Sequence, residues 1–402
     1  MLRPVKYIHR NIERVVQEAI ASFPCTAVTG PRQSGKSTLL LNSMQGYNYV
    51  TLDDPIAREQ AISDPQLFLD TLGPKGIIDE IQLAPQVLSY VKMRVDAARS
   101  VKGQFVFTGS QQFSLIRNLG DSLAGRIGLF DLLPFSLDEL QKAAPQQSIA
   151  EYFVSAALRG MYPEPVLDMA IRPERWFGSY VQTYLERDVR SIYNIGNLRD
   201  FQRFMQLLAG RIGQLLNLSS FASDIGVSIS TIKSWLSILE ASRIVYLLLP
   251  YYNNLGKRVT KAPKAYFLDI GLVCYLTGIR DKTHLLQGPL AGPLFENFCV
   301  HEVVKHFLNA GQRPSLYYLR TSNGLEVDLL IEKSYQELIP VEVKLSKTPS
   351  PAMAAPIMQM KKIFSKLPLR DGFLLSLSEK TIQLTTEVKA LPLDDFLKEI
   401  SR

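Results

Sequence analysis

The stretch VTGPRQSGKST, residues 28–38, follows a short apolar run and leads directly into the helix-like segment STLLLNSM. It fits the spacing G-x-x-x-x-G-K-[ST], and its place between a strand pattern and a helix pattern is typical of a phosphate-binding loop. Glycines let the backbone surround an anion with successive N–H groups, and the helix start adds partial positive charge. The residues predicted to bind a nucleotide are Gly30, Pro31, Arg32, Gln33, Ser34, Gly35, Lys36, Ser37 and Thr38.

Two side chains of this loop have separate predicted roles. Lys36 is expected to reach the outer phosphates, and Ser37 to place its hydroxyl on Mg²⁺. The predicted cofactors are therefore ATP and Mg²⁺.

Acidic residues follow the buried strand pattern in KGIIDEIQ, where Asp79 and Glu80 come directly after GII. An aspartate in this position can hold the metal, and an adjacent glutamate can orient and deprotonate the attacking water. The run QFVFTGSQQF predicts the next strand, and Ser110 at its end is a candidate sensor of the γ-phosphate. An ordinary turn contains the same residue types, so that alternative stays open.

Length and composition favour a globular protein of two or three domains, with 402 residues, 46% hydrophobic and 21% charged. Lys and Arg number 45 against 38 Asp and Glu, which gives a net charge of +7 and favours a polyanionic partner such as DNA without requiring one. The cysteines are Cys25, Cys274 and Cys299, whose wide spacing predicts buried thiols in a reducing compartment. No apolar run approaches the ~20 residues that span a bilayer. We expect a cytoplasmic protein without a membrane partner.

Hydrophobic periodicity divides the chain. Apolar runs at 48–52, 76–79 and 104–108, separated by helix-length segments, predict a parallel sheet with helices on its faces. The pattern is helical from about 150 to 245. Strand patterns return in SLYYLR, LEVDLLIE, LIPVEVKL and DGFLLSLS, which predicts a second mixed α/β domain.

The segments TGPRQSGKST, IIDEIQLAP, FVFTGSQQFSL and LAGRIGLFDLLPFSLDEL, in this order, resemble bacterial and archaeal AAA+ ATPases of the AAA_14/DUF4143 family. They span nearly all of residues 20–140, and NNLGKRVTKAPKAYFLDIGL extends the resemblance. In AAA+ proteins, an arginine of one subunit completes the site of the next. The resemblance implies this role for Arg126 in a homo-oligomer, with a ring as the expected form, and a surface salt bridge is the alternative.

The middle of the chain contains a helix–turn–helix pattern. SSFASDIGVSISTIKSWLSILEASRIVYLL predicts two helices around a turn at Gly226, and the next segment predicts a β-hairpin with basic residues near its bend. Winged helices of this kind bind DNA, but a recognition helix with Lys233 and several serines predicts shape or backbone recognition, not base reading. The alternative is a winged helix used for packing or assembly.

The last domain carries a spaced set of charged residues. GPLFENFCVHEVVKHF predicts a helix with Glu296, NGLEVDLLIE places Asp328 on a strand, and LIPVEVKL places Glu342 and Lys344 on one strand face. This order resembles the PD-(D/E)xK nucleases, although the proline of that name is absent before Asp328. The resemblance implies Glu296, Asp328 and Glu342 as metal ligands, and Glu342 and Lys344 as catalytic residues.

Two alternatives stay open for this domain. The fold can hold nucleic acid without cutting it, and Glu326 competes as a metal ligand. His301 and His306 in HEVVKH are one residue too far apart for an H-E-x-x-H zinc motif, so we interpret both as packing or surface residues.

These patterns predict an α/β protein with an AAA+ P-loop domain at 1–145, a helical connector at 146–210, a winged helix–turn–helix at 211–284 and a nuclease-like domain at 285–402. The predicted function is Mg-ATP hydrolysis coupled to remodelling of DNA, including branched DNA, or to translocation on it. Two alternatives are a metal-dependent nuclease gated by ATP and an NTP-driven switch or assembly protein that acts on a protein partner.

Overall fold

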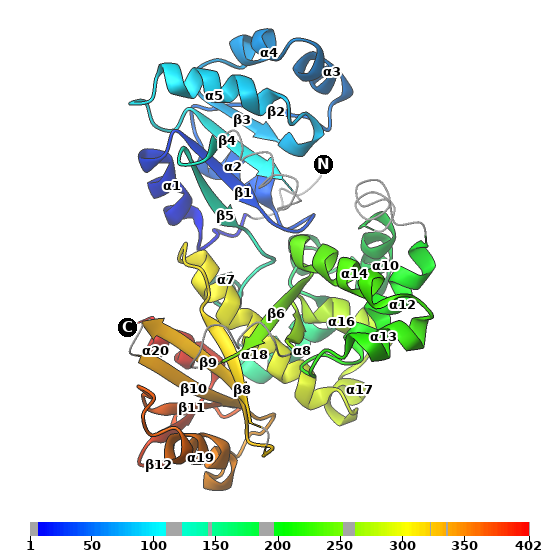
Figure 1. The fold of residues 1–402 in the computed structure, drawn as a ribbon, viewed down its shortest axis with the longest axis vertical. Coiled ribbons are helices and arrows are strands. Elements are labelled where there is room, and N and C mark those ends of the chain that lie inside the picture. The colour runs from blue at the N-terminus through cyan, green and yellow to red at the C-terminus, as the bar shows by residue number, and fades with distance from the viewer. Residues whose placement is uncertain are drawn as a thin grey trace. The chain divides into compact units, whose positions relative to one another are not determined.

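A parallel sheet forms the centre of the N-terminal part of the chain. In the computed structural model its order is β2-β3-β4-β1-β5, and every neighbouring pair is parallel (Figure 1). The strands are β1 (Cys25–Thr29), β2 (Asn48–Thr51), β3 (Gly76–Asp79), β4 (Phe105–Gly109) and β5 (Ile127–Asp131). The predicted parallel sheet is confirmed, whereas β5 was not expected from the sequence.

The structure describes residues 7–109, 123–143, 147–184, 197–251, 262–321, 323–334 and 337–401. The chain divides into two units, of which the first comprises Met1–Phe135, Ala241–Arg243 and Phe307–Gln312. The second comprises Ser136–Glu240, Ile244–His306 and Arg313–Arg402.

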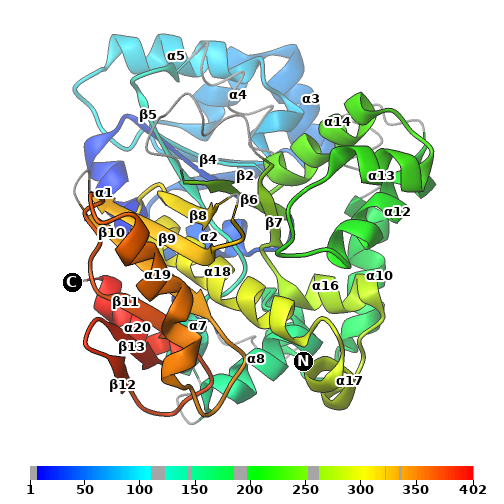
Figure 2. The same cartoon turned by 60° about the horizontal axis from the view of Figure 1, so that its bottom comes forward.

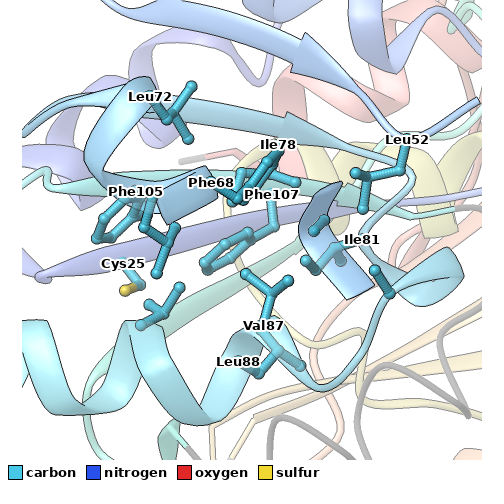
Figure 3. Close-up of a cluster of buried hydrophobic side chains, with 14 of the residues drawn as sticks. Cys25, Leu52, Phe68, Leu72, Ile78, Ile81, Val87, Leu88, Phe105 and Phe107 are labelled. Carbon is cyan, nitrogen blue, oxygen red and sulfur yellow. The ribbon is translucent and has the colours of Figure 1, made fainter. Parts of the chain in front are cut away.

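Helices cover both faces of the parallel sheet. They are α1 (Glu13–Ser22), α2 (Lys36–Ser43), α3 (Pro55–Ser63), α4 (Pro65–Leu72) and α5 (Val87–Ala97), with a 3₁₀ turn η1 (Ile81–Leu83). Figure 3 shows one face, where Phe105 and Phe107 of β4 pack with Phe68 of α4 and Leu88 of α5. Helices α1 and α2 pack on the opposite face. Because both faces are covered, every residue of β1 and β4 is buried, instead of every second one.

The second unit begins with a group of helices. They are α7 (Leu137–Ala143), α8 (Ile149–Arg159), α9 (Pro163–Leu167), α10 (Pro173–Thr183), α12 (Leu198–Ala209), α13 (Leu218–Ile225), α14 (Ile229–Ala241), α16 (Ile270–Thr277), α17 (Lys282–Gln287) and α18 (Ala291–Asn309). The predicted helix–turn–helix is confirmed as α13 and α14, which are joined through Gly226 in a left-handed conformation. Ser148 and Glu151 form a capping box that starts α8.

A mixed sheet completes the second unit, in the order β12-β13-β11-β10-β9-β8-β6-β7 (Figure 2). Its strands are β6 (Val245–Pro250), β7 (Lys264–Phe267), β8 (Leu316–Arg320), β9 (Glu326–Ser334), β10 (Glu337–Val343), β11 (Gly372–Leu375), β12 (Ile382–Thr385) and β13 (Val388–Leu391). The other elements are η3 (Pro351–Ala354), α19 (Ala355–Ile363) and α20 (Leu393–Ile400).

The predicted β-hairpin after α14 is present, since β6 and β7 pair antiparallel. Strand β6 also pairs in parallel with β8, so the hairpin extends the C-terminal sheet and does not stand as a sheet of its own. Its basic bend, at 252–261, lies outside the described residues. This topology brings β7 into the same sheet as the strands that carry Asp328 and Glu342.

The three cysteines are buried and free of disulfides, as predicted. Burial raises the pKa of Cys25 and of Cys274 to about 12. Within the described part of the chain, no helix is sufficiently long and apolar to cross a membrane.

Candidate functional sites

The backbone of the phosphate-loop sequence is strongly curved. Gly30 has φ +146°, and a Cβ on it would lie 2.1 Å from the carbonyl oxygen of Leu132. Gly35, with φ +94°, caps the start of α2, and Gln33 is also left-handed, with φ +60°. Gly30 is therefore required by both conformation and space, because a side chain there would collide with the backbone.

Lys36 begins α2, and its ammonium group is held inside the loop. It donates hydrogen bonds to the carbonyl oxygens of Gly30, at 3.1 Å, and of Pro31, at 2.9 Å, and the residue is only 5% exposed. The buried hydroxyl of Ser34 has no hydrogen-bond partner. A curved backbone, an enclosed cation and an unpaired hydroxyl fit a phosphate group. Of the remaining predicted residues, Arg32 is half-buried and Thr38 is exposed.

Arg10 supports the loop from outside, and the sequence did not reveal it. Its guanidinium group donates to the carbonyl oxygen of Ser34, at 2.9 Å, and to that of Leu133, at 2.7 Å. It also lies 4.8 Å from the ring centroid of Phe135. Arg10 is buried and thus connects the loop to the segment after β5.

Asp79, at the end of β3, is a point where several hydroxyl groups meet. Ser37 Oγ lies 2.9 and 3.0 Å from its two carboxylate oxygens, and the Tyr49 hydroxyl donates to Oδ2 at 2.7 Å. Thr108 donates to Oδ1. Burial and the adjacent Asp79 carboxylate raise the pKa of Tyr49. The structure therefore brings together the two residues, Ser37 and Asp79, that were predicted to hold Mg²⁺.

Glu80 has a left-handed backbone, with φ +58°, which is uncommon for a residue other than glycine. Its N–H donates to Thr108 Oγ1 at 3.0 Å, and its carboxylate accepts from the side-chain amide of Gln82. Thr108 thus links the Asp79 carboxylate to the Glu80 backbone. Ser110, the predicted γ-phosphate sensor, lies outside the described residues.

Arg126, the predicted arginine of the shared site, forms an ion pair with Asp96 of α5. The distances are 2.6 Å from Nε to Oδ1 and 3.1 Å from Nη2 to Oδ2. Within one chain, the guanidinium group therefore has the salt bridge that the alternative interpretation describes. A role in a neighbouring subunit stays a prediction.

Three of the predicted C-terminal residues come together where β9 and β10 lie side by side. Lys344 Nζ lies 2.7 Å from Glu342 Oε2 and 3.5 Å from Asp328 Oδ2. The Val343 N–H also donates to Asp328 Oδ2, at 2.9 Å. Glu342 is 1% exposed, and its Oε1 has no hydrogen-bond partner. Burial and the Asp328 charge raise the pKa of Glu342 to about 8, although Lys344 opposes this shift.

Glu296, on α18, contacts two side chains of β7. Its Oε1 accepts from the Tyr266 hydroxyl and lies 3.3 Å from Lys264 Nζ. Lys264 also pairs with Glu326 Oε1, at 2.6 Å. Burial and the nearby Asp328 charge raise the pKa of Glu296. The predicted set of residues is therefore one electrostatic cluster that additionally contains Lys264, Tyr266 and Glu326.

Two carboxylates of this cluster, those of Asp328 and Glu342, decide whether it can bind a metal ion. Among the described residues, no group of three His, Cys, Asp or Glu side chains is placed to hold a metal. Mg²⁺ is commonly bound by one or two carboxylates together with water and substrate phosphate. Asp328 and Glu342 fit that pattern, and the unpaired Glu342 Oε1 is a suitable ligand atom.

The histidines of HEVVKH take no part in this cluster. His301 is fully buried, and its ring makes an edge contact with Phe298, with centroids 5.5 Å apart. His306 Nε2 lies 3.3 Å from the Ser401 hydroxyl. The interpretation of His301 as a packing residue is confirmed.

Residues 22–141 match the AAA domain family. With the curved loop and the Ser37–Asp79 contact, this match supports an AAA-like P-loop ATPase. Residues 291–396 match DUF4143, and residues 150–283 match DUF8612, both domains of unknown function. The predicted AAA_14 and DUF4143 resemblance is thus found at the family level, whereas the winged-helix and nuclease assignments stay predictions.

Two proteins match nearly the whole length of this chain in sequence. Uncharacterized proteins Rv2008c of Mycobacterium tuberculosis and Mb2031c of Mycobacterium bovis are each 28% identical over 392 residues, which is 96% of this chain and 84% of theirs. A solved structure, the Walker-type ATPase PABY2304 of Pyrococcus abyssi, is 15% identical with a TM-score of 0.45 and covers 68% of this chain and 97% of its own.

Proposed function

We propose that this P-loop ATPase hydrolyses Mg-ATP to remodel DNA or to move along it. The contact between Ser37 and Asp79, next to Glu80, is the observation that supports hydrolysis most directly. Mg²⁺, when bound, neutralises negative charge on the outer phosphates. Lys36 binds those phosphates, Ser37 and Asp79 hold the ion, and Glu80 accepts a proton from the attacking water.

The DNA part of the proposal is supported by charge and by the helix–turn–helix. The chain has a net charge of +7 and a pI near 9.1. Lys233 is exposed on α14, the second helix of the pair. One lysine among serines favours contact with the phosphate backbone, which is independent of sequence and weakens steeply with salt.

ATP turnover in the presence of different nucleic acids tests this proposal. We expect duplex, single-stranded or branched DNA to accelerate turnover, and the effect to weaken as salt rises. If no DNA form binds or accelerates turnover, the proposal fails in favour of an NTP-driven switch that acts on a protein partner.

The shared-site proposal requires an oligomer, for which a ring is the form we propose. Arg126→Ala is expected to abolish turnover and to leave ATP binding intact. Mixing it with Glu80→Gln protein restores activity if an arginine of one subunit serves the site of the next. An absence of rescue at every mixing ratio contradicts a shared site, and Arg126 then serves only its ion pair with Asp96.

A second candidate function is a metal-dependent nuclease gated by ATP. Lys344, between Asp328 and Glu342, is the observation that favours it, because two carboxylates and a lysine can hold a metal and stabilise a developing phosphate charge. Plasmid DNA incubated with Mg²⁺ or Mn²⁺ is expected to be nicked by wild-type protein and not by Lys344→Ala. Lys347→Ala, an exposed neighbour, is the matched control. An absence of nicking by wild type leaves a binding role only.

A further inference from the structure

Lys264 is an unusual lysine, because it is only 2% exposed. Its ammonium group lies 2.6 Å from Glu326 Oε1 and 3.3 Å from Glu296 Oε1, and 5.5 Å from the ring centroid of Tyr318. Burial alone would lower the pKa of Lys264, but the surrounding carboxylates, with Glu296 first, raise it. The ammonium group therefore forms ion pairs with two carboxylates inside the cluster.

The sheet topology places this charge among the carboxylates. Lys264 begins β7, which pairs with β6, and β6 pairs with β8, the neighbour of β9. Glu326 and Asp328 both lie on β9. Residues 150–283, which match one family, thus supply a cation to carboxylates in 291–396, which match another. The site is incomplete without the β6–β7 hairpin.

The carboxylates of the cluster differ in their hydrogen-bond and ion-pair partners. Glu296 Oε1 has two donors, the Lys264 ammonium and the Tyr266 hydroxyl. Glu342 Oε1, by contrast, is buried and has no hydrogen-bond partner. An oxygen left unpaired in the interior is costly unless a ligand satisfies it. On one side, Lys264 pairs with Glu296 and Glu326; on the other, Lys344 pairs with Glu342 Oε2 and Asp328 Oδ2 but leaves Glu342 Oε1 free to bind a further cation.

We propose that Lys264 is a built-in cation, which occupies the position between Glu296 and Glu326 that a divalent metal would otherwise take. The cluster then has room for a single divalent cation, at Asp328 and Glu342. This inference rests on the proposed metal-dependent function only for that second position. Lys264 is a positioning residue, and Glu296 serves as its counter-ion instead of as a metal ligand.

Counting bound Mn²⁺ on the nucleotide-free full-length protein tests the inference, by calorimetry or by the loss of the free-ion paramagnetic signal. Lys264→Met keeps the length of the side chain and removes its charge. Glu296 then lacks a cation, and Glu326 keeps only Arg320, whose Nη1 lies 3.2 Å from Glu326 Oε2. We therefore expect this variant to bind about one more Mn²⁺ per chain than wild type. Mn²⁺ should also raise the melting temperature of Lys264→Met by more than that of wild type.

Matched variants separate charge from packing. Lys264→Arg keeps the charge and is expected to bind no more Mn²⁺ than wild type. The same result is expected for Lys333→Met, because Lys333 is an exposed lysine on the same sheet. The double variant Lys264→Met with Glu296→Gln removes one carboxylate and is expected to lose the extra ion. If Lys264→Met does not fold, Lys264→Gln, which still donates a hydrogen bond, replaces it.

Three outcomes overturn the inference: a folded neutral variant that binds no more Mn²⁺ than wild type, an equal gain in Lys264→Arg, or two ions in wild type that are both lost in Asp328→Asn. A wild type without Mn²⁺ whose neutral variant gains one supports the inference for Lys264. That outcome at the same time removes the metal from the proposed nuclease site, so the two failures are distinguishable.

Discussion

The loop site of the first unit and the carboxylate site of the second are built in different ways. The loop site takes most of its groups from one continuous stretch, residues 30–38, and adds Asp79 at the end of β3 and Glu80 directly after it. The carboxylate site takes its groups from α18, β7, β9 and β10. A local motif thus determines the first site, whereas sheet order determines the second.

Their electrostatics differ as well. Lys36 is satisfied by backbone carbonyl oxygens, which are neutral. Lys264 and Lys344 are satisfied by carboxylates, whose charges shift the pKa of Glu296 and of Glu342 upward together with burial. We therefore expect single substitutions at the first site to stop ATP hydrolysis. At the second site, we expect them to change which carboxylates are paired with a cation.

The largest expected effect tests the first half of this comparison. Glu80→Gln keeps the size of the side chain and removes the base, so ATP turnover should fall by about 10²–10⁴-fold while ATP binding is retained. Turnover and nucleotide affinity are measured on the same protein, with Glu59→Gln on α3 as the exposed control. Unchanged turnover in Glu80→Gln would show that Glu80 is not the base.

The next effect concerns the backbone of the loop. In Gly30→Ala, the new Cβ would lie 2.1 Å from the Leu132 carbonyl oxygen, at a φ of +146°. Overpacking and backbone strain of this kind cost about 1–3 kcal/mol each, so ATP affinity should fall at least about tenfold. Gly46→Ala is the control, since its φ is +82° but its Cβ would meet nothing within 4 Å. Equal losses in the two variants would contradict the role of the Leu132 contact.

A third effect tests whether buried charge also controls the stability of the second unit. Burial and the charge of Lys305 lower the pKa of His301 from 6.5 to about 4. The carboxylate of Glu302, which opposes this shift, lies 3.0 Å from His301 Nε2. Between about pH 6.5 and pH 4, His301 therefore binds a proton in the unfolded chain but not in the folded chain. This contribution is fully present above pH 6.5 and is lost as pH falls toward 4.

Wild type should accordingly lose about 2 kcal/mol of unfolding free energy between about pH 7 and about pH 5 from His301 alone. His301→Phe keeps the ring that packs against Phe298 and should remove that part of the pH dependence. Urea unfolding at both pH values measures the difference, and His284→Phe on α17 is the control. The same slope in wild type and His301→Phe would mean that other groups produce it.

The sequence predicted what depends on neighbours along the chain. It located β1 to β4, the helix–turn–helix and the strands of the last domain, because each has its own periodicity. It also placed Ser37 next to Asp79, since the carboxyl ends of parallel strands meet at one edge. It missed β5, β12 and β13. Length is not the reason, because β2 and β3, which were located, have four residues each.

The missed site residues share one cause, namely that their partners are distant in sequence. Arg10 reaches Leu133, and Lys264 reaches Glu296 and Glu326. Neither contact has a signal in the spacing of residues. The position of Lys264 follows only when β6 is known to pair with β8, which places β7 at the edge of the C-terminal sheet. Lys264, one of the basic residues that had indicated a wing, begins β7 and lies inside the cluster.

The smallest expected effect sharpens the comparison, because it tests a contact of the first site that also depends on sheet order. Tyr49 lies on β2, next to β3, and its hydroxyl donates to Asp79 Oδ2 at 2.7 Å. This bond orients the carboxylate that faces Ser37. Since one hydrogen bond contributes about 0.5–1.5 kcal/mol, Tyr49→Phe should raise the Mg²⁺ concentration needed for half-maximal ATP turnover by about two- to tenfold.

Tyr47→Phe, the control, loses a similar bond, to the Gly103 carbonyl oxygen, and should leave the Mg²⁺ requirement unchanged. If the two variants shift it equally, the loop site depends on its own stretch of sequence alone, and the orientation of Asp79 does not depend on β2.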